Sequence, residues 1–184
     1  DLQCGGLIHC GRHGPAGDNL VVWQNSARTS WRTYGRRYGQ RRSYPLSHTR
    51  TFTVEAEPSS LYVDLHAAAL AAFEAIKGVL RPGARSEDIV EAASVIEDAG
   101  FTTCDDLTHG YGGGYFPPIT GSKSRPNEPV PDFTFEKNHM LVIQPNVITL
   151  DRKAGVQTGE CVVITKDGCQ SLHDAPSGLL HVGG

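Results

Sequence analysis

Apolar residues recur at three- and four-residue steps after Pro58, which is the spacing of one face of an α-helix. Pro82-Gly83 ends this pattern, because proline and glycine both interrupt a helix. The predicted buried stripe consists of Leu61, Leu65, Ala68, Ala69, Ala72, Phe73, Ile76 and Leu80. The chain therefore predicts one long helix that lays an alanine-rich face against a core.

A second helix is predicted to begin at Ser86, which we expect to be its N-cap. Glu87 and Asp88 follow in the first turn, where negative charge is favoured by the helix dipole, and Gly100 ends the helix. The apolar side of this helix is formed by Ile89, Val90, Ala93 and Ile96.

The second half of the chain contains two long apolar runs that predict β-strands, Met140 to Val147 and Val156 to Thr165. Lys166-Asp167-Gly168 predicts a turn into a short edge strand around Gln170 to His173. Residues 176–184 are predicted to be a frayed tail.

Near the N-terminus, Cys4 to Cys10 and Asn19 to Trp23 predict a hairpin. Two helices packed on a curved antiparallel sheet make an α+β domain. At 184 residues the default is one domain over residues 1–184.

An arginine-rich segment, residues 26–48, shows no period of 2 or 3.6. No acidic residue occurs between Asn19 and Val54. Three interpretations stay open. The segment is a solvated loop, which we favour; it is a basic patch with interleaved aromatic residues that binds an acidic ligand or a single-stranded nucleic acid; or it results from a translated frameshift or a sequencing error.

Composition argues against some classes of function. The net charge of −3 argues against a general nucleic-acid binder, and no apolar run reaches the length that a membrane helix needs. The five cysteines form no close pairs, which favours reduced thiols in a cytoplasmic protein. Because the only methionine is Met140, we expect a further region before residue 1.

The clearest chemical signal is Thr108 to Pro118, a histidine followed by glycines and closed by two prolines. Glycine permits close approach of the backbone, so His109 is predicted to face a ligand. Together with Thr49-Arg50-Thr51-Phe52, the two helices and the two apolar runs, this segment resembles the pita-bread metallopeptidase family of methionine aminopeptidase, aminopeptidase P, prolidase and creatinase. The resemblance covers roughly residues 45–175 and implies the pita-bread fold.

The resemblance also implies a ligand set of two aspartates, one histidine and two glutamates around two divalent metals such as manganese or cobalt. His109 matches the histidine. The aspartate positions fall near Arg36 and on Ser47, and the glutamate positions fall on Gln144 and Gly159. With one ligand of five present, no dinuclear metal centre is predicted, since two dications repel without carboxylates between them.

The neighbours Glu160 and His48 each lie one residue from a ligand position. They would reach the centre only after a one-residue slip, which turns a strand side chain to the opposite face. The substrate-contacting histidine of the family falls on Phe116.

These observations support two hypotheses for the function of the chain. The first is a metal-independent hydrolase of amide or peptide C–N bonds, with His109 as catalytic base, Asp105 or Asp106 orienting it, and Gln144, Asn146, Glu160, Phe116 and His48 as substrate contacts. The base of creatinase would fall near Val22-Trp23, so its mechanism does not transfer directly. The second is an inactive homologue that binds a peptide or protein. The resemblance also implies a homodimer.

Overall fold

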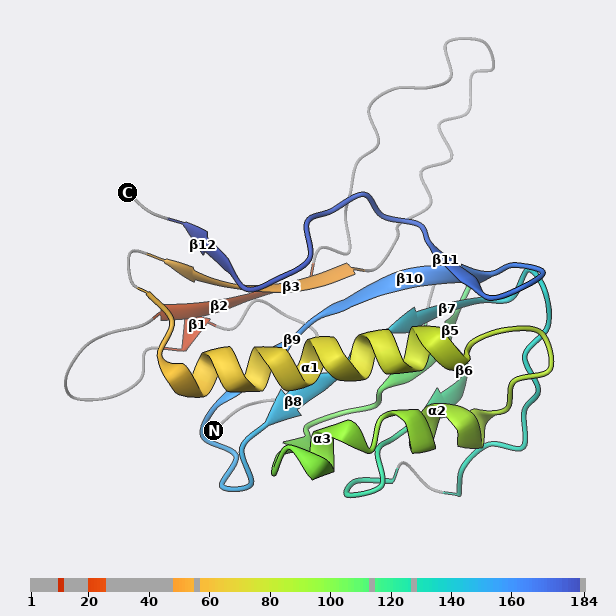
Figure 1. The fold of residues 1–184 in the computed structure, drawn as a ribbon, viewed down its shortest axis with the longest axis horizontal. Helices are drawn as coiled ribbons and strands as arrows, with labels where there is room; N and C mark the ends of the chain where they lie inside the picture. Colours follow the sequence, from red (N-terminus) through yellow and green to blue (C-terminus); the bar gives the residue numbers. More distant parts are fainter. Residues whose placement is uncertain are drawn as a thin grey trace, which may run out of the picture.

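The structure is a computed structural model that describes residues 10–11, 20–25, 48–54, 57–112, 115–126 and 129–182. Within these residues, three helices pack beside two β-sheets (Figure 1). The helices are α1 (Ser60–Val79), α2 (Ser86–Ala92) and α3 (Val95–Asp98). The strands are β1 (Cys10–Gly11), β2 (Leu20–Asn25), β3 (His48–Val54), β4 (Thr102–Thr103), β5 (Thr108–Tyr111), β6 (Tyr115–Thr120), β7 (Met140–Ile143), β8 (Asn146–Ile148), β9 (Gly155–Gln157), β10 (Gly159–Ile164), β11 (Cys169–Ser171) and β12 (Leu180–Val182).

The larger sheet has the order β1-β2-β3-β10-β7-β5-β6, with β11 paired to β10 and β12 paired to β3. The smaller sheet has the order β4-β8-β9. Among the described strands, all pairs are antiparallel except β12 with β3. The α+β pita-bread architecture predicted from the sequence is confirmed in the part of the chain that the structure describes.

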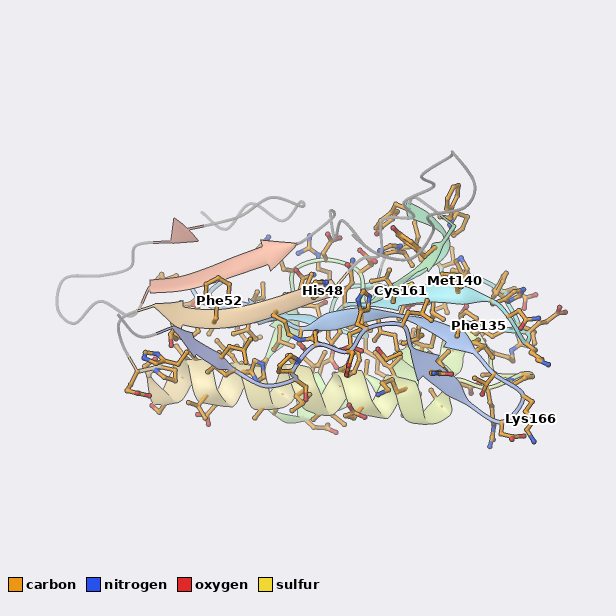
Figure 2. The ribbon with its side chains drawn as sticks, turned by 90° about the horizontal axis from the view of Figure 1, so that it is seen from above. His48, Phe52, Phe135, Met140, Cys161 and Lys166 are labelled. Atoms are coloured by element: carbon orange, nitrogen blue, oxygen red, sulfur yellow. The ribbon has the colours of Figure 1, made fainter. Side chains whose placement is uncertain are left out.

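The long helix α1 buries the predicted stripe from Leu65 to Ile76, whereas Leu61 is exposed. Its buried side chains pack with residues of β7 and β10, such as Leu141 and Val162, in one hydrophobic core. This core fixes one face of the larger sheet against the helix, as the view from above in Figure 2 shows.

The second predicted helix is divided into α2 and α3, and Gly100 ends it with a φ of +82°. Its N-cap is Arg85 rather than Ser86, because the Arg85 backbone N–H donates to Asp88 Oδ2 at 2.8 Å. Ser86 is the first helical residue and is buried.

Both long apolar runs are interrupted, which corrects the prediction of two continuous strands. The first passes from β7 in the larger sheet to β8 in the smaller one at Gln144-Pro145, and the second passes from β9 to β10 at Thr158. Proline has no N–H to continue a ladder, and the Thr158 N–H instead donates to the Pro145 carbonyl at 3.3 Å. Gln144 therefore lies at the junction of the two sheets.

The predicted frayed tail is wrong for residues 180–182, which form β12 parallel to β3. Long-range contacts hold this segment: Arg50 Nε donates to the Pro176 carbonyl at 2.8 Å, and His181 Nδ1 lies 2.9 Å from Thr53 Oγ1. The turn at 166–168 leads to β11 as expected.

The predicted N-terminal hairpin is confirmed as far as it is described, because Cys10 pairs with Val22 in antiparallel register. Most of the Cys4 to Cys10 strand and all of residues 26–46 lie outside the described residues.

Of the cysteines whose side chains are described, Cys161 and Cys169 are free thiols. Cys104 is disulfide-bonded, so the expectation of five reduced thiols is wrong there. Disulfide pairing depends on the distance between cysteines in the fold, which sequence spacing alone does not reveal. In the described part of the chain, no helix combines the length and the hydropathy needed to span a membrane.

Candidate functional site

The two faces of the larger sheet differ in chemistry. His109 on β5 lies opposite Val142 on β7, and Val142 lies opposite Cys161 on β10, so these three side chains share one face. The alternate residues, such as Leu141 and Val162, face the core beside α1. The candidate site is therefore on the face turned away from α1.

His109 is only 4% exposed, and Nδ1 of its ring lies 2.9 Å from the Gly110 carbonyl oxygen. A carbonyl can only accept, so Nδ1 carries the proton and Nε2 has the lone pair of the neutral ring. The Tyr115 ring stacks on the imidazole with centroids 4.0 Å apart. Burial lowers the pKa of His109 below its ordinary value, against opposing effects of Gly110, Asp105 and Gln144. The neutral form therefore predominates at neutral pH.

Gln144 is buried next to His109, where the Gln144 backbone N–H donates to the Leu107 carbonyl at 2.8 Å. Its side-chain Nε2 donates to Asp106 Oδ2 at 3.3 Å. The Gln144 side chain also lies close to His109 and opposes the lowering of the pKa of His109 by burial. Gln144 thus connects the histidine with a carboxyl group.

Asp106 has no exposed surface, and its Oδ1 has no hydrogen-bond partner among the described residues. Burial raises the pKa of Asp106 to about 7, and the Asp105 carboxylate adds to this effect, while a hydrogen bond from Tyr115 opposes it. The sequence suggested that Asp105 or Asp106 orients His109. In the structure the Asp106 carboxyl accepts from Gln144 and also interacts with Tyr115 and Asp105.

The raised pKa of Asp106 predicts that stability falls as the pH rises. Unfolding restores the ordinary pKa of 3.8, so the folded chain retains its proton between pH 4 and about 7, and stability is lost across this interval. Asp106→Asn cannot ionise. Urea unfolding should show the variant gaining about 4 kcal/mol relative to the wild type between pH 4 and pH 8. A constant difference across this range would contradict the assignment.

Asn146 uses its side chain to hold the turn that carries Asp106. Its Oδ1 accepts from the backbone N–H groups of Cys104 at 2.7 Å and Asp105 at 2.6 Å. Its Nδ2 donates to the Asp106 carbonyl at 2.8 Å and to the Gln144 carbonyl at 3.3 Å. Asn146 is buried and lies beside the site, with its amide committed to backbone groups.

Glu160 and His48 pair with each other across β10 and β3, and Glu160 also lies opposite Ile143 of the core. Glu160 follows Gly159 and precedes Cys161, so its side chain points away from the His109 face. One carboxylate oxygen of Glu160 pairs with Arg50 and the other accepts from the Ser171 hydroxyl. The structure therefore does not bring Glu160 and His48 together with His109.

Phe116 lies opposite Gly110 on β6 and is 50% exposed. It lines an open groove of about 340 Å³ at the end of strands β5 to β7. The groove is formed by Gly110, Tyr111, Gly112, Phe116, Pro117, Pro118, Phe133, Phe135, Asn138, His139, Met140 and Leu141. The aromatic residue against His109 is instead Tyr115, which sequence reasoning missed because the family pattern directed attention to position 116.

The metal ligands implied by the family resemblance can be tested at the described positions. Gln144 is a neutral amide that already donates to Asp106, and Gly159 has no side chain. A Cβ atom on Gly159 would collide with the Ile143 carbonyl oxygen and come within 2.7 Å of Gln144 Cα. Among the described residues, no group of three or more His, Cys, Asp or Glu side chains is placed to hold a metal. Arg36 and Ser47 lie outside these residues, and the donors that are described do not fit a dinuclear centre.

Several solved structures share this fold. The dipeptidase PepE from Mycobacterium ulcerans matches with a TM-score of 0.69 and 22% identity, covering 91% of this chain and 41% of that protein. The X-Pro aminopeptidase from Thermotoga maritima matches with a TM-score of 0.67 and 21% identity, and the match covers 90% of this chain and 42% of that protein. The methionine aminopeptidase from Rickettsia prowazekii matches with a TM-score of 0.59 and 17% identity, and the match covers 84% of this chain and 64% of that protein.

The chain thus spans about two fifths of the first two of these proteins. A search of curated proteins found no match. The sequence profile of metallopeptidase family M24 matches residues 35–166, which is more than half of the chain. On the strength of this match and of the shared fold, the chain belongs to metallopeptidase family M24.

Proposed function

We propose that this chain forms the hydrolytic domain of a peptidase-like enzyme that cleaves a C–N bond in a small amide or peptide, with His109 as base and without the family's dinuclear metal centre. The observation that carries the proposal is the hydrogen bond between His109 Nδ1 and the Gly110 carbonyl, which leaves Nε2 as an acceptor beside Gln144. The family and the fold support the hydrolase class. The donor set at Gln144 and Gly159 supports the absence of the metal centre.

The proposed chemistry needs one proton carrier. A water molecule gives a proton to His109 Nε2 while its oxygen bonds to the amide carbonyl carbon. The C–N bond then breaks, and the protonated His109 returns the proton to the leaving nitrogen. Gln144 assists by holding the water or the substrate in hydrogen-bond reach of Nε2.

The test is a screen of dipeptides and small amides with the purified full-length protein, followed by His109→Ala on any substrate that is cleaved. We expect this variant to lower kcat at least about a hundredfold. His139→Ala, which removes a histidine of the groove, is the matched control and should retain activity. EDTA should have no effect. Activity that is lost with EDTA and restored by manganese would contradict the proposal.

The rate should depend on pH through His109. Because burial lowers the pKa of His109 below 6.5, the neutral base is present at neutral pH and is lost only under acidic conditions. The acid limb of kcat/KM should therefore have its midpoint below pH 6.5. An acid limb centred well above pH 7 would indicate a different catalytic group.

A second candidate function is binding of a peptide or partner chain without catalysis. The exposed Phe116 at the groove favours it, because half-exposed aromatic residues in grooves often anchor partners. Phe116→Ala should then weaken capture of a peptide from a random library at least about tenfold. Leu150→Ala, at a residue that is 73% exposed outside the groove, should leave capture unchanged. Equal capture by both variants would contradict this candidate.

A further inference from the structure

The side-chain amide of Gln144 has a defined direction. Above pH 7 the Asp106 carboxyl is ionised and can only accept hydrogen bonds, and Gln144 Nε2 donates to its Oδ2 at 3.3 Å. The oxygen end of the amide is therefore the end available to His109. Gln144 lies beside His109 on the same face, because Val142 is opposite His109 and Gln144 follows two residues later.

The tautomer of His109 places a second acceptor at the same point. Nδ1 donates to the Gly110 carbonyl, so Nε2 of the neutral ring carries a lone pair. Gln144 Oε1 and His109 Nε2 are then two neighbouring acceptors with no proton between them. Such a pair favours a partner that brings hydrogen-bond donors.

The position of Asp106 is fixed by the backbone around it. The Asp106 N–H donates to Asp105 Oδ1 at 2.9 Å, and the Asp106 carbonyl accepts from Asn146 Nδ2 at 2.8 Å. Tyr115 donates a further hydrogen bond to the carboxyl group. The carboxyl is wholly buried, and only one of its oxygens has a partner among the described residues. The geometry thus holds one acceptor against the nitrogen end of Gln144.

We propose that Asp106 is a positioning residue that fixes the Gln144 amide with its oxygen toward His109, so that the site selects ligands that present an N–H donor. The inference deepens the proposed function, because it specifies the polarity of the ligand group at that site. It concerns binding and does not require turnover.

The test compares two probes of similar shape, benzamide, which carries N–H donors, and N,N-dimethylbenzamide, which carries none. Isothermal titration calorimetry on the full-length protein at pH 8 should give at least about tenfold tighter binding of benzamide. Asp106→Asn should reduce this preference to threefold or less, because the asparagine amide can donate to Gln144 and let its amide reverse. Asp105→Asn keeps an oxygen for the Asp106 N–H and should keep the preference.

A second measurement uses the wild-type protein alone and covers the case in which Asp106→Asn does not fold. Benzamide should shift the ¹⁵N resonance of His109 Nε2 in the direction of a hydrogen-bonded acceptor, and the dimethyl compound should not. Equal affinity for the two probes, no binding of benzamide, or an unchanged preference in Asp106→Asn would overturn the proposal. Selective binding without hydrolysis of any substrate would contradict the proposed function and support this inference.

Discussion

Replacing Arg50 with methionine should lower the free energy of unfolding by about 3–5 kcal/mol. Arg50 is buried and forms an ion pair with the equally buried Glu160. Its guanidinium also donates to the carbonyls of Thr49 and Gly159, each at 2.9 Å, and to Pro176. Methionine fills a similar volume but leaves the Glu160 carboxylate without a counter-charge in the interior.

Urea unfolding followed by circular dichroism measures this loss. Arg85→Met is the matched control, because Arg85 is exposed and pairs with Glu87 and Asp132 at the surface, where such pairs contribute about 0–1 kcal/mol. The double variant Arg50→Met, Glu160→Met should recover part of the loss by removing the unpaired charge. If Arg50→Met cost no more than Arg85→Met, the buried ion pair would not hold β3, β10 and the C-terminal segment together.

Gly159→Glu, which restores a glutamate of the family's metal centre, should destabilise the chain by about 3 kcal/mol or more. A Cβ atom at this position would meet the Ile143 carbonyl, the Gln144 Cα at 2.7 Å and the Thr49 hydroxyl at 2.8 Å. Two of these atoms belong to the backbone of the neighbouring segment, which cannot withdraw without opening the pairing of β7 with β10.

Gly78→Glu is the control for this substitution. Gly78 is an exposed residue of α1, and no atom lies within 4 Å of a Cβ built there. The Gly78 variant should remain within about 1 kcal/mol of the wild type. A stable Gly159→Glu protein that also gained manganese binding would contradict the close packing at Gly159.

The helices and the fold class were accessible from the sequence because their signals are local. The apolar stripe from Leu65 to Ile76 has a single period, and the glycine at position 100 needs a positive φ. The strand junctions were not accessible, since Met140 to Val147 is apolar on both sides of the break. Only the pairing of Pro145 with Thr158 shows where the chain changes sheets.

The candidate site was predictable in part. His109 and Gln144 follow from the family pattern. Glu160 and His48 were predicted as substrate contacts together with His109, whereas the alternation of strand side chains places them on the other face. Asp106 and Tyr115 depend on tertiary contacts, because the carboxyl is brought to Gln144 by a turn held by Asn146. The spacing of residues along the sequence does not predict this contact between Asp106 and Gln144. The same holds for Arg50, because its partners other than Thr49 lie more than 100 residues away in the chain.

Isothermal titration of manganese or cobalt into the metal-stripped full-length protein tests most directly whether this site works without the dinuclear centre of family M24. The neutral amide of Gln144, already bonded to Asp106, and the bare backbone at Gly159 predict no tight binding. Tight binding that saturates at two equivalents of metal would contradict the proposal.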